Sequence, residues 1–205
     1  MLTTITAALL AISAVLPING TQSTAPPNRI TIEVVTVNGS GCPAGTALVE
    51  PAADNKTFMV IYSDFLAQAG AGAEPTDFRQ NCQLNLRVTV PTGFTYGIAR
   101  SEYRGFAHLE PGSTGLQRAL YYFQGTAETT KATHTFTSPL SDNWEHVDQP
   151  QDIVYAPCGE KRNLNINTEL RVGAGTSNPS TTSFITMDST RGSLRAKYDF
   201  AWKTC

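Results

Sequence analysis

The chain has 205 residues, with 15 basic and 17 acidic side chains and a formal net charge of −2 at pH 7. This length fits one domain, or one domain with short extensions. Positive and negative residues are interspersed, without the basic stripe of a nucleic-acid-binding protein or a charge run that would bind anionic lipid. Composition therefore favours a globular domain and argues against a nucleic-acid partner.

The N-terminal region is apolar and carries no charged side chain before Arg29. Its apolar run, from about Ile5 to Leu16, is too short to span a bilayer and is typical of a secretory signal, whereas an N-terminal core helix would need caps that are absent. No later segment approaches membrane-spanning length, so we expect a secreted protein without membrane insertion. The expected segments are a signal peptide over 1–20, a polar spacer over 21–29 and a single domain over 30–205.

The four cysteines are Cys42, Cys82, Cys158 and Cys205. An even count in an exported chain is typical of disulfides, and four cysteines allow three connectivities. We predict Cys42–Cys82 and Cys158–Cys205, because each pair joins neighbouring segments and neither bridge then spans the whole domain. Each would close a loop of roughly 40 residues, worth at most about 4 kcal/mol in the chain-entropy model. A zinc site, the competing interpretation, lacks a Cys-x-x-Cys pair or a nearby histidine.

The stretch NGSGCPAGT at 38–46 is rich in glycine, as phosphate-binding loops are. Such loops continue into a Lys-Ser/Thr pair and a helix, whereas a short strand pattern follows here. We therefore interpret the glycines as turn positions beside a disulfide. Sequons at Asn38 and Asn55 predict N-linked glycans in a eukaryotic host, whereas a proline excludes the one at Asn178.

Alternation of apolar and polar residues is the main secondary-structure signal. It predicts three half-buried antiparallel strands: Leu84–Val90, Leu164–Val172 and Leu194–Trp202. Turn residues separate the further predicted strands: Ile30–Val37, Thr46–Val49, Thr57–Tyr62, Phe94–Tyr103, Phe106–Glu110, Leu116–Gln124, Thr133–Thr137 and Thr182–Met187. One helical turn is expected over 63–69, after a Ser63 cap. Many short strands predict an all-β, two-sheet antiparallel sandwich of the jelly-roll or immunoglobulin-like kind.

Six short motifs follow one another along the chain. They are GSGCPAGT, NCQLNLRVTVPTGFTY, YRGFAHLEPG, YYFQG, SPLSDNW and PCGEKRNLNINTELRV. Together they resemble a secreted family of fungi and actinomycetes, domain of unknown function family 4360, from about Val37 to Cys205. The resemblance implies an extracellular all-β domain with the cysteines paired as above. It carries over no catalytic residue, because the family has no agreed activity.

Enzymatic chemistry finds little support in the sequence. No serine lies in a Gly-x-Ser-x-Gly elbow, and disulfide formation would leave no thiol nucleophile. The histidines, His108, His134 and His146, lack metal-site spacing, so scattered positions are the simpler interpretation, although clustering in the fold stays open. Secreted copper monooxygenases of the sandwich type use an N-terminal histidine, and none precedes His108. We predict no catalytic residue, metal or cofactor.

Two polar constellations remain. Acidic residues in the segment SDNWEHVDQPQD suit calcium on an irregular loop, although a solvated acidic loop is the simpler interpretation; they are Asp142, Glu145, Asp148 and Asp152. The stronger candidate is a row that shares one strand face at a spacing of about 7 Å: Asn163, Asn165, Asn167, Glu169 and Arg171. This row would hydrogen-bond a saccharide, or would face solvent with cross-strand partners such as Arg195, Lys197 and Asp199.

Catalysis and sugar stacking each suggest further residues. An acid/base hydrolase needs two carboxylates about 5–9 Å apart, and Glu169 with Asp199 is the pair to inspect. Candidate stacking platforms for sugars are Trp144, in the acidic loop, and the run Tyr121, Tyr122 and Phe123, in which at least one ring should face away from the core, although most aromatic residues of a sandwich fill its core.

These observations predict a secreted, monomeric β-sandwich that binds an extracellular polysaccharide or surface protein without catalysis. The predicted binding residues are Asn165, Asn167, Glu169 and Arg171. The alternatives are an extracellular hydrolase with a carboxylate site on one sheet, and a structural component of the cell wall.

Overall fold

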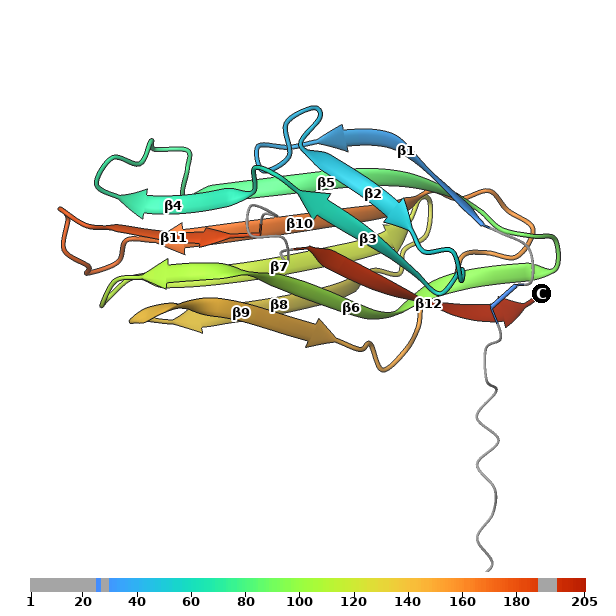
Figure 1. The fold of residues 1–205 in the computed structure, drawn as a ribbon. Helices are drawn as coiled ribbons and strands as arrows, with labels where there is room; N and C mark the ends of the chain where they lie inside the picture. The colour runs from blue at the N-terminus through green and yellow to red at the C-terminus, as the bar shows by residue number, and fades with distance from the viewer. Residues whose placement is uncertain (1–24, 27–29, 188–194) are drawn as a thin grey trace, which may run out of the picture.

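The computed structural model describes residues 25–26, 30–187 and 195–205. The regular elements in these residues are all β-strands, and they form two antiparallel sheets that face each other (Figure 1). The expected signal peptide lies outside the described residues, as does the expected spacer apart from Ala25 and Pro26. The predicted fold, an all-β antiparallel sandwich, is confirmed.

The first sheet has five strands in the order β1-β5-β10-β7-β8. They are β1 (Thr31–Asn38), β5 (Arg79–Thr89), β10 (Leu164–Gly173), β7 (Thr114–Phe123) and β8 (Thr130–Thr137). The central strand, β10, is therefore paired along both edges, with β5 on one side and β7 on the other.

The second sheet has seven strands, six of them in the order β2-β3-β12-β6-β11-β4. They are β2 (Ala47–Pro51), β3 (Thr57–Tyr62), β12 (Ala196–Thr204), β6 (Phe94–Leu109), β11 (Thr182–Thr186) and β4 (Leu66–Gly70). The seventh, β9 (Leu140–Asp148), pairs with residues 101–109 of β6. Because β8 and β9 follow each other in the chain, the connection between them links the two sheets at one edge of the sandwich (Figure 1).

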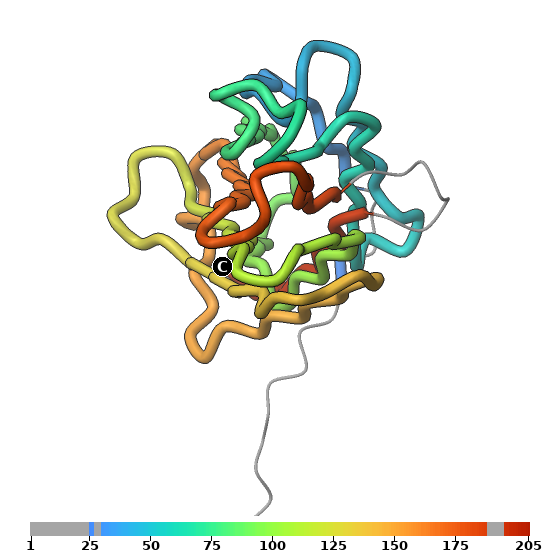
Figure 2. The backbone as a smooth tube through the Cα atoms, turned by 90° about the vertical axis from the view of Figure 1, so that its left-hand side faces the viewer, coloured from blue at the N-terminus to red at the C-terminus, as the bar shows by residue number. Residues whose placement is uncertain are grey.

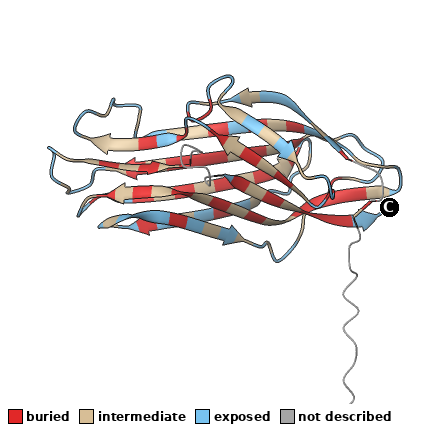
Figure 3. Cartoon of the chain, in the orientation of Figure 1, coloured by how far each residue is buried: buried red, intermediate tan, exposed pale blue. Residues whose placement is uncertain are grey.

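The core lies between the sheets, and buried positions alternate with more exposed ones along the strands (Figure 3). Seen from one end, the backbone encloses this core (Figure 2). Aromatic rings fill much of it: Phe58 stacks on Tyr198 with ring centroids 4.8 Å apart, and Tyr96 meets Phe123 edge-on at 5.3 Å. Successive side chains of a strand point to opposite sides of the sheet, so every second residue faces the core and the residues between face solvent.

Both predicted disulfides are confirmed. Cys42–Cys82 ties the 39–45 turn to β5, and Cys158–Cys205 ties the segment before β10 to the end of β12. The backbone of the NGSGCPAGT stretch also agrees with a pinned turn, since Gly39 and Gly45 have φ of 135° and 89°. A side chain is strained at such φ values, which is why glycine occupies them.

The helical turn expected over 63–69 is wrong, because this segment forms β4, which pairs with β11. The hydroxyl of Ser63 donates to the carbonyl of Thr46 at 3.3 Å instead of capping a helix. Pairing with a distant strand therefore outweighs the local helix signal. The sequence LAQAG is too short for its periodicity to separate helix from strand.

Two further boundaries differ from expectation. The predicted strands Phe94–Tyr103 and Phe106–Glu110 are one 16-residue strand, β6. The acidic segment expected to be irregular is a strand over Leu140–Asp148, which buries Trp144. An edge strand buries only part of its inward face, so several inward positions of this strand are polar. The apolar–polar alternation that marks a strand is therefore weak in its sequence.

Candidate functional site

The predicted polar row lies on the outward face of β10, at the centre of the five-stranded sheet. Inward residues of the same strand, including Ile166 and Leu170, are fully buried. Asn165, Asn167 and Arg171 are partly exposed, whereas Glu169 is only 7% exposed. Because β10 lies between β5 and β7, the row and the outward side chains of these two strands form one continuous surface.

Those neighbours come from β5 and β7. In register they are Asn85 and Tyr122 beside Asn165, Gln83 and Leu120 beside Asn167, Asn81 and Arg118 beside Glu169, and Arg79 and Leu116 beside Arg171. The expected partners Arg195, Lys197 and Asp199 are wrong. They lie on or just before β12, which belongs to the other sheet, and sequence alternation alone cannot say which strands are paired.

The first half of the row is an arrangement of amides. Nδ2 of Asn163 donates to Oδ1 of Asn85 at 2.7 Å, and Nδ2 of Asn85 donates to Oδ1 of Asn165 at 2.8 Å. Among residues 30–187 and 195–205, nothing accepts a hydrogen bond from Nδ2 of Asn165, and the Asn167 amide makes no side-chain hydrogen bond. These two amides are available to a ligand.

The second half of the row is cationic. Glu169 accepts a hydrogen bond from Nε of Arg79 at 2.6 Å, and Nε of Arg171 lies 2.7 Å from its other oxygen. Arg118 is a third cation, 4.0 Å away. Burial by itself would raise the pKa of the Glu169 carboxyl, but its contacts with Arg171 and Arg79 outweigh burial and hold the pKa below its ordinary value. This carboxylate stays ionised, and the arginines around it carry excess positive charge.

Aromatic side chains flank the row at both ends. Tyr122 lies in register with Asn165, and Phe78, 49% exposed, lines a hollow of about 300 Å³ that also includes Arg171. At about 3.3 Å per residue, the strand from Asn165 to Arg171 spans roughly 20 Å. The outward orientation of Tyr122 confirms the expectation that the Tyr-Tyr-Phe run sends one ring away from the core, since Tyr121 and Phe123 are buried.

The carboxylate pair suggested for a hydrolase is not formed. Glu169 and Asp199 belong to different sheets, and each is engaged by cations on its own sheet. Asp199 lies in a charge network on the outward face of the seven-stranded sheet, which joins Arg100 and Lys197 to it. The network extends through Glu102 and Arg104 to Glu145. Cations and carboxylates alternate in this network, so this face has no excess positive charge of the kind found around Glu169.

The acidic segment does not gather a calcium site. Asp148 points inward and bonds to His134, whereas alternation turns Glu145 to the opposite face of β9. No group of three or more His, Cys, Asp or Glu side chains is arranged to hold a metal in the described part of the chain. Trp144, a candidate stacking platform, instead fills the core, as most sandwich aromatics do, and is buried against Phe136 at a ring-centroid distance of 5.4 Å.

A histidine cluster at the β8–β9 edge escaped the sequence analysis. The rings of His134 and His146 stack 3.9 Å apart, and Nε2 of His134 lies 3.0 Å from both carboxylate oxygens of Asp148. Burial, followed by the charge of His134, lowers the pKa of His146 to about 4. Alternation along β9 would have turned His146 inward, to the side on which His134 lies, but this inference required β9 to be recognised as a strand. His108 lies elsewhere, beside Glu110 and Ser141.

The two sequons differ in the folded chain. Asn38 is exposed at the end of β1. Asn55 is 5% exposed, its Oδ1 accepts from the backbone of Ile30 at 3.0 Å, and its Nδ2 donates to the carbonyl of Pro26 at 3.2 Å. Asn38 therefore presents its amide at the surface, whereas the amide of Asn55 is used within the fold.

Two antiparallel sheets and two disulfides define this protein as a disulfide-bonded β-sandwich of the extracellular type. The chain belongs to the family described as domain of unknown function DUF4360, whose profile matches residues 28–205. A relative from Arthroderma benhamiae, described as an uncharacterized secreted protein, is 33% identical over 191 residues, which cover 92% of this chain and 77% of the relative.

One solved structure similar to this chain is the enzymatically active domain of tailspike protein 4 from bacteriophage CBA120. The match has 11% identity and a TM-score of 0.26, and it covers 91% of this chain but 21% of the phage chain. An overlap of this quality supports no inference about fold or function. The secreted relative and the disulfides instead establish that the protein is secreted and extracellular. None of the described residues forms a helix that could cross a membrane.

Proposed function

We propose that this protein binds an extracellular polysaccharide, of a cell wall or a host surface, without catalysis and as a monomer. The binding surface is the outward face of the five-stranded sheet, centred on Asn165, Asn167, Glu169 and Arg171. The observation that carries the proposal is the combination, on β10 and the strands beside it, of amide N–H donors that no described residue uses and a cluster of arginines, with an aromatic ring at each end.

The chemistry of these groups matches that of a sugar polymer. A side-chain amide both donates and accepts hydrogen bonds, as a sugar hydroxyl does, so Asn165 and Asn167 suit a neutral part of the polymer. The faces of Tyr122 and Phe78 offer apolar surface for the C–H faces of sugar rings. Guanidinium groups bind carboxylates and phosphates in a bidentate manner, so the Arg171 end suits an acidic substituent.

Glu169 has a positioning role in this proposal. A general acid needs a carboxyl whose pKa is raised toward neutrality, and the arginines shift the pKa of Glu169 the other way. Its ionised carboxylate holds Arg79 and Arg171 in place on the sheet. This arrangement supports binding rather than hydrolysis.

The test is a pull-down of the purified protein on chitin, cellulose, β-glucan and whole cell wall, with released sugars assayed in the same tubes. We expect retention on at least one polymer without sugar release. Replacing both Asn167→Ala and Arg171→Ala should weaken retention at least about tenfold, because losing one neutral and one charge-assisted hydrogen bond costs more than about 1.4 kcal/mol. Arg104→Ala, an arginine of the opposite face, is the matched control and should leave retention unchanged.

Other outcomes would contradict the proposal in different ways. Sugar release would favour the hydrolase alternative. Retention that is unaffected by the double substitution would move the binding surface elsewhere. If the protein binds none of the polymers, a structural role or a protein partner would be favoured.

A further inference from the structure

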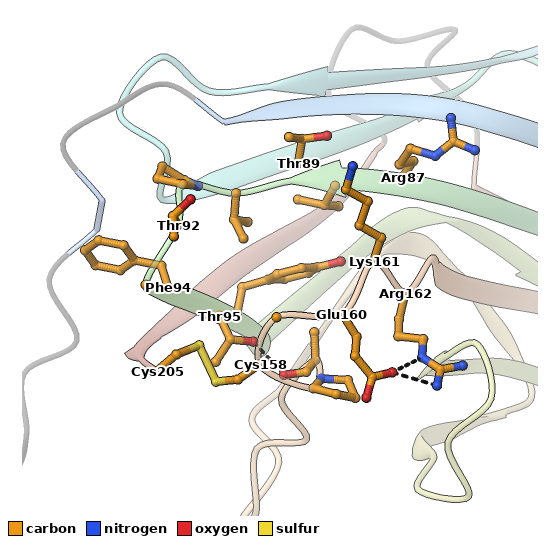
Figure 4. A pocket seen from close by; sticks show the side chains of 18 of the residues that line it. Arg87, Thr89, Thr92, Phe94, Thr95, Cys158, Glu160, Lys161, Arg162 and Cys205 are labelled. Carbon is orange, nitrogen blue, oxygen red and sulfur yellow. Dashed lines mark hydrogen bonds and ion pairs between the residues drawn. A yellow bond between two sulfur atoms is a disulfide. The ribbon is translucent and has the colours of Figure 1, made fainter.

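A second cavity is lined by residues at the end of the sandwich that carries Cys205 (Figure 4). It has a volume of about 630 Å³ and is enclosed by the β5–β6 turn and by the 156–163 segment, which crosses from one sheet to the other. This volume lies in the range of small-molecule sites. The polysaccharide proposal makes no use of this cavity.

The wall formed by the 156–163 segment is fixed in place. The hydroxyl of Thr95 donates to the carbonyl of Ala156 at 2.6 Å, and the Ala156 amide donates to the carbonyl of Tyr96 at 2.9 Å. The Cys158–Cys205 disulfide then fastens the segment to the end of β12 (Figure 4). A covalently held wall keeps the cavity open without ligand, which lowers the ordering cost of binding.

The interior of the cavity is largely apolar but contains one unmatched polar group. Val88, Val90 and Tyr96 are among its lining residues. Tyr96 is 2% exposed, and its ring packs on Phe123 and Phe200. Within the part of the chain that the structure describes, its buried hydroxyl has no hydrogen-bond partner. Buried hydroxyls are normally paired, so an orphan on a residue that lines the cavity favours a ligand that reaches it and supplies an acceptor.

The rim of the cavity has excess positive charge. Glu160 is neutralised by Arg162, with Nε 2.7 Å from the carboxylate, and Arg87 is paired with Glu33 at 2.9 Å. Lys161 makes no ion pair with any described residue. Its side chain extends from the 156–163 segment toward the strand that carries Thr89 and Arg87 (Figure 4). An ammonium group without a carboxylate favours an anionic ligand.

We propose that this cavity binds a small amphipathic acid. The apolar body of the acid lies against Val88 and Val90, and its carboxylate pairs with Lys161 and accepts a hydrogen bond from the Tyr96 hydroxyl. Burial raises the pKa of Tyr96, so this hydroxyl remains a donor throughout the neutral range. The same site would take an aliphatic or an aromatic acid, since both offer an apolar body and one carboxylate.

The test is isothermal titration of the oxidised protein with decanoate and with trans-cinnamate, below the concentration at which decanoate forms micelles. We expect saturable binding of at least one acid, and the comparison between them identifies an aliphatic or an aromatic body. Decanol and decyltrimethylammonium, which share the apolar chain but lack the carboxylate, should bind at least about tenfold more weakly. Binding of none of these probes would overturn the proposal.

Two substitutions locate the site. Tyr96→Phe should weaken acid binding at least fivefold without lowering the melting temperature, because the hydroxyl has no internal partner to lose. Lys161→Gln should weaken it to a similar degree, whereas Lys131→Gln, on the exposed face of β8, is the matched control and should have no effect. Acid binding that survives both Tyr96→Phe and Lys161→Gln would overturn the location. Equal binding of decanoate and decanol would overturn the preference for an anion.

Discussion

At the scale of single residues, His146 couples the stability of the fold to pH. Its ring lies between the sheets, stacked on His134 and in contact with the rings of Trp144 and Phe136. Burial and then the charge of His134 lower its pKa from 6.5 to about 4, and the nearby carboxylate of Asp148 offsets only part of this shift. The folded protein therefore prefers a neutral His146.

This shift predicts a loss of stability in mild acid. Between pH 6.5 and pH 4 the unfolded chain takes up a proton at His146 that the folded chain does not, so the contribution of His146 is complete above pH 6.5 and falls as pH decreases toward 4. Urea unfolding across this range should therefore show a shallower decline for His146→Phe than for the wild type. His108→Gln, which removes a histidine outside the cluster, should follow the wild type. Parallel profiles for His146→Phe and the wild type would contradict the assignment.

At the scale of elements, β6 depends on a glycine within its length. Gly105 lies opposite Trp144 of β9, and a Cβ placed there would lie 1.9 Å from the carbonyl oxygen of Thr186 and 2.4 Å from the Trp144 ring. A side chain at this position would separate the strands on both sides. Gly105 therefore allows close packing at the junction of β6, β9 and β11, and it does not mark a turn.

Gly105→Ala should consequently destabilise the protein by about 1–3 kcal/mol, the usual effect of overpacking a close-packed interior. Gly173→Ala is the matched control, because its added Cβ would meet only the rotatable hydroxyl of Thr114 at 2.6 Å. We expect this control to be close to neutral in chemical denaturation. A Gly105→Ala variant as stable as Gly173→Ala would show that the neighbouring strands can move apart at little cost.

The same elements show what could be predicted from the sequence. The alternation in 164–172 correctly identified β10 and the outward direction of Asn165, Asn167, Glu169 and Arg171, because a strand has two faces and only one was apolar. It could not identify the neighbouring strands, so Arg79 and Arg118, which lie around Glu169 together with the predicted Arg171, were missed. The end cavity was also missed, because β5, β6 and the 156–163 segment meet there only after both sheets have formed.

At the scale of the whole molecule, the two disulfides close loops of similar length but lie in different surroundings. Their sequence separations are 40 and 47 residues, so the chain-entropy model assigns each about 4 kcal/mol. Cys42 and Cys82 are 0% and 1% exposed, whereas Cys158 and Cys205 are exposed. The difference between them therefore lies in burial.

Paired alanine substitutions should reveal this difference. Cys42→Ala with Cys82→Ala should lose more stability in urea unfolding than Cys158→Ala with Cys205→Ala, because removing buried sulfur atoms also leaves a cavity in the core. The second pair serves as the control for loop entropy. Equal losses for the two pairs would indicate that the packing around Cys42 and Cys82 relaxes fully.

The arginines around Glu169 also give the molecule two electrically unequal sides. Carboxylates and cations alternate on the outer face of the seven-stranded sheet, whereas Arg79, Arg118 and Arg171 share a single carboxylate on the opposite face. Near an acidic surface, the electric field of that surface orients the protein before any contact forms. Salt at 0.15 M limits this orienting effect to protein–surface separations of about 8 Å. On an acidic surface the sandwich would therefore settle flat, with β10 toward that surface and β12 facing the medium.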